Sequence, residues 1–456
     1  MLLFRSRSLI AIAVLLATTS LASPLSAETL DEALTRAYET NSTLLAARAA
    51  LRATDQGVSQ ALSRWRPIVS AGADISRSQS YSNTRSPATR YTTPRGADLS
   101  IVQPLYDPVA DAATNRAEKD VLAARARLVT TEQQILFAAM SAYVNVVRDQ
   151  ALLDLNINNE QRLRRRLEAA NDRFLVGEIT RTDVAQSEAG LARATANRIQ
   201  AEGNLAASRA VYRNAVGDPQ GNFVVPKVPG NLPVMQDEAI SVSSARYPDV
   251  LASEYTAQSA RENIRAIEGE LWPKLNVRGT MSVDRSSTTS RSTEANSASI
   301  TAEISVPLYT AGGIAARIRA AKETAFQRQF QVDDARGDAM ESAARAWLSL
   351  ETASASLRAY DSEIQASQIA LDGVEKEALV GSRTVLDVLD AEQSLLTAKA
   401  NLVGAQRNEI YAAYELKAAI GSLTARELGL QVPYYDEEKN YKDMRGKWWG
   451  NSIEGE

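Results

Sequence analysis

The chain of 456 residues carries 55 acidic and 51 basic side chains and contains neither cysteine nor histidine. Without these two residue types there are no disulfides, no Cys-His or Ser-His-Asp catalytic sets and none of the usual zinc sites. The net charge of −4 argues against a nucleic-acid partner. Composition therefore favours a protein that is not an enzyme and uses no cofactor.

Residues 1–27 are typical of a secretory signal peptide. Two arginines precede an apolar run from Leu9 to Ala17, and small residues stand before the acidic Glu28. We place the cleavage after Ala27, which leaves a mature chain with a net charge of −6 because both arginines are removed. The apolar run is too short to span a bilayer comfortably, which makes a retained anchor the weaker interpretation, and no later segment approaches about 18 apolar residues.

The mature chain contains one unit of about 200 residues twice. The segment RFLVGEITRTDVAQSEAGLARA, which begins at Arg173, matches EALVGSRTVLDVLDAEQSLLTAKA, which begins at Glu377. Upstream, QPLYDPVADAATNRAEK at Gln103 matches VPLYTAGGIAARIRAAK at Val306. We expect a first repeat over 28–217, a linker over 218–236, a second repeat over 237–421 and a C-terminal tail over 422–456.

Each repeat is predicted to contain a helix, two strands, a long helix, a tight turn and a shorter helix. The Ala-rich opening helices are expected from about Leu30 to Ser63 and from about Asp237 to Glu270. The long helices, Val109–Phe174 and Ile314–Ala378, contain no proline and would each extend about 100 Å. The two shorter helices of a repeat, stacked end to end, have about the same total length as the long helix. They could lie alongside it and form a tubular wall.

The strands, expected at about 67–104 and 273–307, alternate between apolar and polar residues. Alternation places the apolar side chains on one face of the sheet. That face carries Val69, Ala71, Ala73, Ile75, Ala97, Leu99 and Ile101 in the first repeat, and Leu275, Val277, Gly279, Met281, Val283, Ala298, Ile300, Ala302, Ile304 and Val306 in the second. The polar segments Gln79–Arg95 and Arg285–Asn296 are predicted to be exposed loops between the strands.

Strands of about 10 residues with one apolar and one polar face, in a chain with a signal sequence, fit an outer-membrane β-barrel. A soluble two-sheet domain is the alternative. Aromatic residues favour the barrel. Trp65 and Trp272 precede the first strand of each pair, and Tyr106 and Tyr309 follow the second, so all four fall at one end, where an interfacial aromatic belt belongs. Four strands cannot close a barrel, since roughly eight are needed, so the barrel must be shared between subunits.

The turns at 176–180 and 380–384 reverse the chain between helices. Each contains a valine, a helix-stopping glycine and a threonine: Val176, Gly177 and Thr180, then Val380, Gly381 and Thr384. Thr180 with Asp183, and Thr384 with Asp387, form the pattern of a capping box. Asp390 lies beyond the reach of capping, and its counterpart in the first repeat is Gln186, while Arg383 stands where the first repeat has Ile179.

The chain resembles the TolC family of outer-membrane channel proteins in four features: these turns, the VLDAEQSLLTAK segment, the two PLY segments and the duplicated layout. The resemblance covers nearly the whole mature chain. It implies a mainly helical homotrimer with a 12-stranded membrane β-barrel, four strands from each subunit, and a long periplasmic α-barrel. It also implies that the turns form a tip that closes and that docks a periplasmic adaptor (membrane fusion) protein serving an inner-membrane transporter of the resistance-nodulation-division or ABC type.

Matched residue by residue, Asp387 and Asp390 resemble the acidic positions that line the narrow aperture. Arg383 resembles the basic residue that tethers the inner hairpin, and Asp183 resembles its acidic partner on the neighbouring hairpin. Some family members have a tyrosine three residues before the turn glycine. Here that position is Ala378, so the closed state is expected to lack one link.

The sequence thus predicts a passive exit duct in the outer membrane of a Gram-negative bacterium, in contact with outer-membrane lipid. It would carry drugs, bile salts or detergents in a tripartite efflux pump, or polypeptides in type I secretion. A periplasmic coiled-coil scaffold without a pore is the alternative. A hydrolase is disfavoured because no carboxylates pair outside the cap-like turns. For the tail, with Tyr434-Tyr435 and Trp448-Trp449, the expectation is a strap outside the tunnel.

Overall fold

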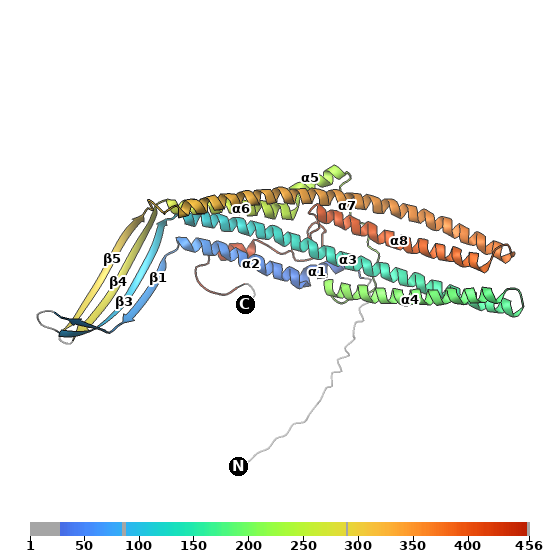
Figure 1. Cartoon of the computed structure of the whole chain (residues 1–456), viewed down its shortest axis with the longest axis horizontal. Helices are drawn as coiled ribbons and strands as arrows, with labels where there is room; N and C mark the ends of the chain where they lie inside the picture. Colours follow the sequence, from blue (N-terminus) through green and yellow to red (C-terminus); the bar gives the residue numbers. More distant parts are fainter. Residues whose placement is uncertain (1–27, 84–87, 289–290, 454–456) are drawn as a thin grey trace, which may run out of the picture.

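The computed structural model describes residues 28–83, 88–288 and 291–453; the predicted signal peptide lies outside the described residues. An antiparallel sheet occupies one end of an elongated molecule, and a bundle of long helices extends from it (Figure 1). Among the described residues, no helix is long and apolar enough to cross a membrane.

Two very long helices are the longest elements of the bundle, as the sequence predicts. Helix α3 (Pro108–Leu175) has 68 residues and α7 (Gly313–Leu379) has 67. Asp107 starts α3 by accepting a hydrogen bond from the Val109 N–H. Pro108 is well suited to the first helical position, because the N–H that proline lacks would have no partner within the helix there. Each long helix therefore extends about 100 Å at 1.5 Å per residue.

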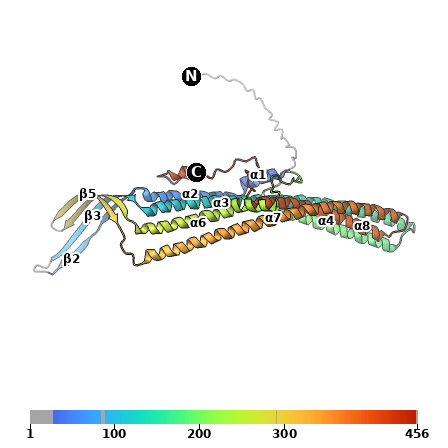
Figure 2. The ribbon, with the colours of Figure 1, turned by 90° about the horizontal axis from the view of Figure 1, so that it is seen from above.

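Shorter helices lie end to end beside each long one, which confirms the expected stacking. Helices α2 (Ser42–Leu62) and α4 (Arg181–Ala215) contact α3, while α6 (Pro248–Glu268) and α8 (Val385–Ala419) contact α7. Near the sheet, α2, α3, α6 and α7 lie side by side in that order (Figure 2). One chain therefore forms a curved section of wall.

The opening helix of each repeat is broken, which corrects the expectation of one continuous helix. The first repeat has α1 (Leu30–Thr40) before α2, and the second has α5 (Gln236–Arg246) before α6. Asn41 is extended, and its side chain caps α2 by accepting from the Thr43 and Leu44 N–H groups. Tyr247 is extended because Pro248 follows it, a signal that the continuous-helix prediction overlooked.

The sheet has the strand order β1-β3-β4-β5, all antiparallel, with β2 continuing the β1 position. The strands are β1 (Ile68–Ile75), β2 (Ser78–Ser82), β3 (Ala88–Tyr106), β4 (Lys274–Thr288) and β5 (Ser292–Ser305). The β3–β4 pair joins the two repeats. The first repeat therefore supplies one hairpin and the second repeat the other, giving four strand positions in each chain.

The pairing register confirms the predicted apolar face. Ala71 pairs with Leu99, Leu99 with Met281 and Met281 with Ala298, so one apolar row crosses all four positions. These side chains are exposed in the single chain: Ile300 is 85% exposed and Met281 61%. The opposite face carries hydroxyls, with Ser70 and Ser100 oxygens 2.7 Å apart and Thr280 and Ser299 oxygens 2.8 Å apart. Such a sheet suits lipid on one side and water on the other.

The described parts of the predicted loops at Gln79–Arg95 and Arg285–Asn296 are largely strand, so the hairpins are longer than expected, while residues 84–87 and 289–290 lie outside the described residues. Polar side chains pair across the strands there. The Ser78 and Thr92 hydroxyl oxygens lie 2.6 Å apart, and Arg285 forms an ion pair with Glu294 at 2.9 Å. Cross-strand polar pairs stabilise a ladder as apolar pairs do, which a search for apolar alternation does not detect.

The four aromatic residues predicted at the membrane interface lie at the end of the sheet that joins the helices. Trp65 ends the short helix η1 (Ser63–Trp65), Tyr106 ends β3, Trp272 follows η2 (Gly269–Leu271) and Tyr309 follows β5. Tyr309 is 88% and Trp272 58% exposed, and Trp272 lines one groove with Tyr106. Their placement at one end agrees with the prediction; their role as an interfacial belt stays a prediction.

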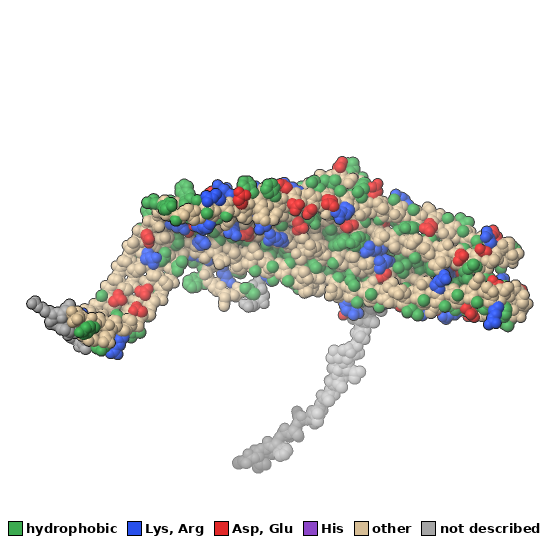
Figure 3. Space-filling model, viewed as in Figure 1, with side chains coloured by type: hydrophobic (Ala, Val, Ile, Leu, Met, Phe, Trp, Pro, Cys, Tyr) green, Lys and Arg blue, Asp and Glu red, His purple; other side chains and the backbone are tan. Residues whose placement is uncertain are grey.

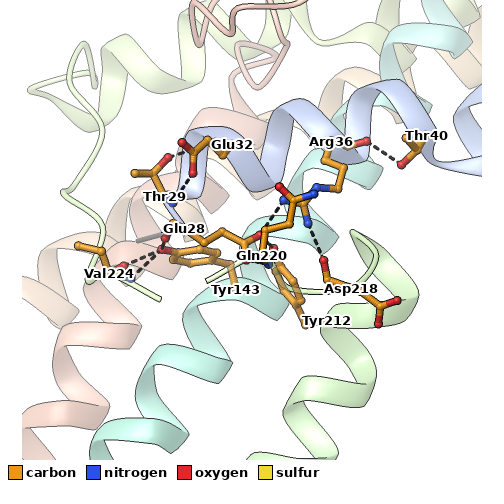
Figure 4. A network of polar contacts seen from close by, with 10 residues as sticks. All are labelled: Glu28, Thr29, Glu32, Arg36, Thr40, Tyr143, Tyr212, Asp218, Gln220 and Val224. Carbon is orange, nitrogen blue, oxygen red and sulfur yellow. Dashed lines mark hydrogen bonds and ion pairs between the residues drawn. The ribbon is translucent and has the colours of Figure 1, made fainter. Parts of the chain in front are cut away.

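The largest apolar core lies midway along the bundle, where α1, α3, α4, α8 and the tail meet. Beside it, Glu28 is 2% exposed and joins several segments (Figure 4). Its carboxylate accepts from the Tyr212 hydroxyl and the Gln220 N–H and pairs with Arg36 at 3.2 Å, while its carbonyl accepts from the Tyr143 hydroxyl at 2.7 Å. Burial raises the pKa of Tyr143 to about 12, so this hydroxyl stays a donor.

Within the part of the chain that the structure describes, the two outer strands of the sheet, β1 and β5, each have one edge without a partner strand. Because unpaired backbone groups are costly in lipid, we expect the edges to pair between subunits and the purified protein to be a trimer. Native mass spectrometry in detergent checks this. A stable monomer with intact strands would contradict it.

Candidate functional site: the tips of the helical hairpins

Both hairpin turns have the same backbone geometry. Gly177 and Gly381 adopt left-handed φ values of 78° and 79°, which glycine takes without strain. The Glu178 N–H donates to the Arg173 carbonyl at 2.9 Å, and the Ser382 N–H donates to the Glu377 carbonyl at 3.0 Å. These six-residue closures satisfy carbonyls that the ends of α3 and α7 leave free.

Both capping boxes form as the sequence predicts. The Asp183 carboxylate accepts from the Thr180 N–H at 2.9 Å, and the Asp387 carboxylate accepts from the Thr384 N–H at 2.8 Å. The hydrogen bonds from Thr384, together with the nearby Arg383 charge, lower the pKa of Asp387 below its usual value. Asp387 therefore carries its negative charge while it starts α8.

An ion pair closes each tip, with opposite polarity in the two repeats. In the first, Arg173 at the end of α3 lies 3.7 Å from Glu178. In the second, Glu377 at the end of α7 pairs with Arg383, with Nε 2.9 Å from the carboxylate. Both members of the second pair are half-exposed. Within one chain, then, Arg383 has a partner on its own hairpin, and the predicted pairing with Asp183 stays a prediction.

Asp390 lies on α8 at the groove between α4 and α8, which has a volume of about 200 Å³. Gln186, its counterpart in the first repeat, lines the same groove from α4, together with Arg193. The Asp390 side chain is exposed, and it follows Asp387 by about one helical turn. Of the two predicted aperture residues, only Asp387 is used by a cap.

Sequence reasoning missed a buried ionic contact that joins the two hairpins. One Nη of Arg166, on α3, lies 2.8 Å from Glu375 on α7 and 2.8 Å from Glu392 on α8. The Glu392 side chain is 7% exposed, and its second oxygen has no hydrogen-bond partner. Burial raises the pKa of Glu392 despite the attraction of Arg166 and Arg162. One arginine thus holds the first hairpin against both helices of the second.

The signal for this contact is the position of Glu392 on a buried stripe. Val388 and Leu395, four residues before and three after it, are both buried against α7. A carboxylate on such a stripe requires a cationic partner from a facing helix. The first-repeat counterpart, Glu188, is exposed. The repeat therefore duplicates the residue but not its environment.

Apolar residues are exposed at both tips, at matching positions of the two repeats. Leu175 and Val176 are 80% and 72% exposed, and Leu379 and Val380 are 71% and 80% exposed. Acidic and basic side chains lie near them at the end of the bundle farthest from the sheet (Figure 3). A groove of about 840 Å³ separates the tips, lined by Arg162, Arg165, Arg166 and Arg173 among others.

The fold defines a class of protein: a channel subunit with an amphipathic membrane sheet and a helical wall. The family of outer membrane efflux proteins matches residues 33–218 and 239–422. The chain therefore belongs to this family, that of TolC. It is an outer-membrane channel protein for efflux or secretion, with a periplasmic extension and no enzymatic activity. This sets aside the alternative of a scaffold without a pore.

Similarity to individual relatives extends over almost the whole chain. The outer membrane efflux protein BepC of Brucella suis is 35% identical over 446 residues, covering 97% of this chain and 96% of the relative. The outer membrane protein TolC of Vibrio cholerae is 28% identical, covering 90% and 94%. The solved structure of the Campylobacter jejuni CmeC outer membrane channel aligns with a TM-score of 0.78 at 14% identity, covering 91% of this chain and 89% of that one. Family membership implies a trimeric channel that works with an efflux or secretion system.

The raised pKa of Glu392 predicts how stability depends on pH. Its ordinary value is about 4.5, and the folded chain holds the proton more tightly than the unfolded chain does. The contribution of Glu392 to the free energy of unfolding is therefore most favourable below pH 4.5. It is lost as the pH rises through the higher pKa of the folded chain, by about 1.4 kcal/mol for each unit by which the folded pKa exceeds the unfolded one. Glu392→Gln, which does not titrate, should gain stability relative to wild type as the pH rises from 4.5 to 7.

Thermal dissociation of the trimer across this pH range is the measurement. Glu188→Gln is the matched control, because it makes the same change at the exposed repeat counterpart and should leave the pH profile unchanged. A stability difference between Glu392→Gln and wild type that does not vary with pH, or that falls as the pH rises, would contradict the assignment of a buried titrating carboxylate.

Proposed function

We propose that the hairpin tips of three subunits form a closable, cation-selective periplasmic entrance to the channel. The observation that carries the proposal is the charge asymmetry between the repeats. Each turn is already closed by glycine, by a capping box and by an ion pair, and Asp390 takes part in none of these. Yet the second repeat adds Arg383 and Asp390 where the first has Ile179 and Gln186.

In this proposal Asp387 and Asp390 of each subunit face the channel axis. Two carboxylates from each of three chains would place six negative charges at one constriction. Converging charges of one sign raise the local concentration of counter-ions and bind multivalent cations most strongly. The field would be local, with a screening length of about 10 Å at 0.1 M salt.

The two turns are proposed as the docking surface for a periplasmic adaptor protein. Support comes from the exposed Leu-Val pair that ends the long helix at each tip, because an exposed apolar patch repeated at equivalent positions is typical of a protein contact. Val176, Gly177 and Thr180 form the first turn, and Val380, Gly381 and Thr384 the second. The adaptor would connect the channel to an inner-membrane transporter of the resistance-nodulation-division or ABC type, with drugs, bile salts or polypeptides as cargo.

Arg383 is proposed to restrain the closed tip through Asp183 of a neighbouring hairpin. Arg383→Ala should then raise single-channel conductance in planar bilayers, because the inner hairpin loses a charge-assisted tether. The control is Glu377→Ala, which removes the partner of Arg383 on its own hairpin and should leave conductance unchanged. If both substitutions raise conductance equally, the pair within the hairpin is the restraint and the role of Asp183 is wrong.

Replacing both Asp387 and Asp390 with Asn should lower cation selectivity and abolish block by trivalent cations added from the periplasmic side. The reason is the loss of all six converging charges. Glu178→Gln is the control, since it removes an exposed carboxylate at the tip of the first hairpin without touching the proposed ring or the proposed tether between Arg383 and Asp183. Block that survives in the double variant, or that is lost equally in the control, would return Asp387 and Asp390 to a purely structural role.

A further inference from the structure

The C-terminal tail follows α2 toward the sheet. Three contacts show its direction: the Asn440 amide donates to Asp55 at 2.7 Å, the Ser59 hydroxyl donates to the Met444 carbonyl at 2.7 Å, and Arg66 donates to the Lys447 carbonyl at 2.8 Å. Later residues of the tail thus contact later residues of the first repeat, so the two segments run in the same direction. Asn440 is 5% exposed, so the short helix α9 (Lys439–Arg445) is packed firmly in place.

The tail then turns and presents two tryptophans outward. The Lys447 ammonium donates to the Ser452 carbonyl at 3.0 Å, and Gly450 adopts a left-handed φ of 98°, so residues 447–452 form a closed turn. Trp448 and Trp449 lie within this turn and are 60% and 87% exposed. The hydrogen-bonded turn keeps two large aromatic side chains exposed to solvent. Packing within the chain does not explain this exposure.

Arg66 fixes the height of this turn relative to the membrane. Its guanidinium lies 5.0 Å from the centre of the Trp448 ring, and it stands two residues before β1. The first strand residues, Ile68 and Val69, are each 61% exposed on the sheet. The tryptophans are therefore beside the point where the chain enters the membrane sheet, at the end that carries Trp65, Tyr106, Trp272 and Tyr309.

The chemistry of the turn fits the headgroup layer of a phospholipid leaflet. Indole rings combine an apolar body with a polar N–H and accumulate at the level of the headgroups. Arg66, which stacks on Trp448, and Lys447, within the turn, add positive charge that suits lipid phosphates. The exposed sheet begins two residues after Arg66, so lipid around the sheet would lie beside this turn, and a protein partner would have to displace that lipid.

We propose that Trp448 and Trp449 insert into the periplasmic leaflet of the outer membrane and act as a lipid anchor outside the β-barrel. The tail thereby links the membrane surface to α2 and holds the helical wall at a fixed angle to the membrane. This proposal depends on the membrane location of the channel and not on the gating of its tips.

The test uses full-length protein with a single tryptophan, reconstituted in vesicles of phosphatidylethanolamine and phosphatidylglycerol with or without brominated acyl chains. One variant keeps only Trp449 and replaces the other four tryptophans with Phe. The control keeps only Trp347, which is half-buried on α7 beside Ala343 and about 50 Å along that helix from the sheet. Heat-dissociable trimers on a gel establish that each variant is folded.

Brominated lipid should reduce the emission of Trp449 and leave the emission of Trp347 unchanged. Two results would overturn the proposal. Quenching of Trp449 by aqueous iodide but not by brominated lipid would place the turn in water. A blue-shifted emission that neither agent quenches would place it against a neighbouring subunit.

A second measurement does not depend on replacing four tryptophans. The chain has no cysteine, so W449C gives a single site for a nitroxide label. Collisions of the label with oxygen should exceed those with a water-soluble nickel chelate, as expected for a lipid environment. Greater access for the nickel chelate would overturn the proposal.

Discussion

Unpaired backbone groups at the edges of the sheet are the constraint on which the rest of this structure depends. Among the described residues, strands β1 and β5 each have one edge that pairs with no other strand, and one face of the sheet exposes a continuous apolar row. Neither an open edge nor irregular backbone is stable in a hydrocarbon layer, so the edges must meet those of other subunits. Closing the sheet in this way also sets the helices side by side, because each strand pair joins a long helix at the same end. The helical tunnel therefore follows from the requirements of the strands.

Regular features of the chain could be predicted from the sequence, because they depend on local periodicity. The alternation from Leu275 to Val283 correctly predicted which face of the sheet is apolar, and the absence of proline correctly predicted the length of α7. Features that depend on partners distant in the sequence were missed. The pairing of Arg166 with Glu392 joins residues 226 positions apart, and the strand character of Ser78–Ser82 depends on hydroxyl pairing across β3. The break at Tyr247 was different, since Pro248 marks it in the sequence.

The duplicated chain uses its two copies differently. The copies share the glycine turn, the capping box and the exposed Leu-Val pair, which are the parts that any stable hairpin tip of this kind uses. They differ in charge at Arg383 and Asp390, and in the environment of Glu392. The shared residues form the structure of the turns, and the differences are the basis for the role proposed for the second hairpin. Arg166 connects the two by holding α3 against α7 and α8.

The central claim is that the second hairpin of each subunit lies nearer the channel axis than the first. Distances between spin labels in the trimer test this directly, because the chain has no cysteine of its own. A label at position 390 and, in a separate sample, a label at the repeat-equivalent position 186 give two sets of distances between subunits. The account predicts shorter distances for position 390. Equal distances, or shorter ones for position 186, would contradict it.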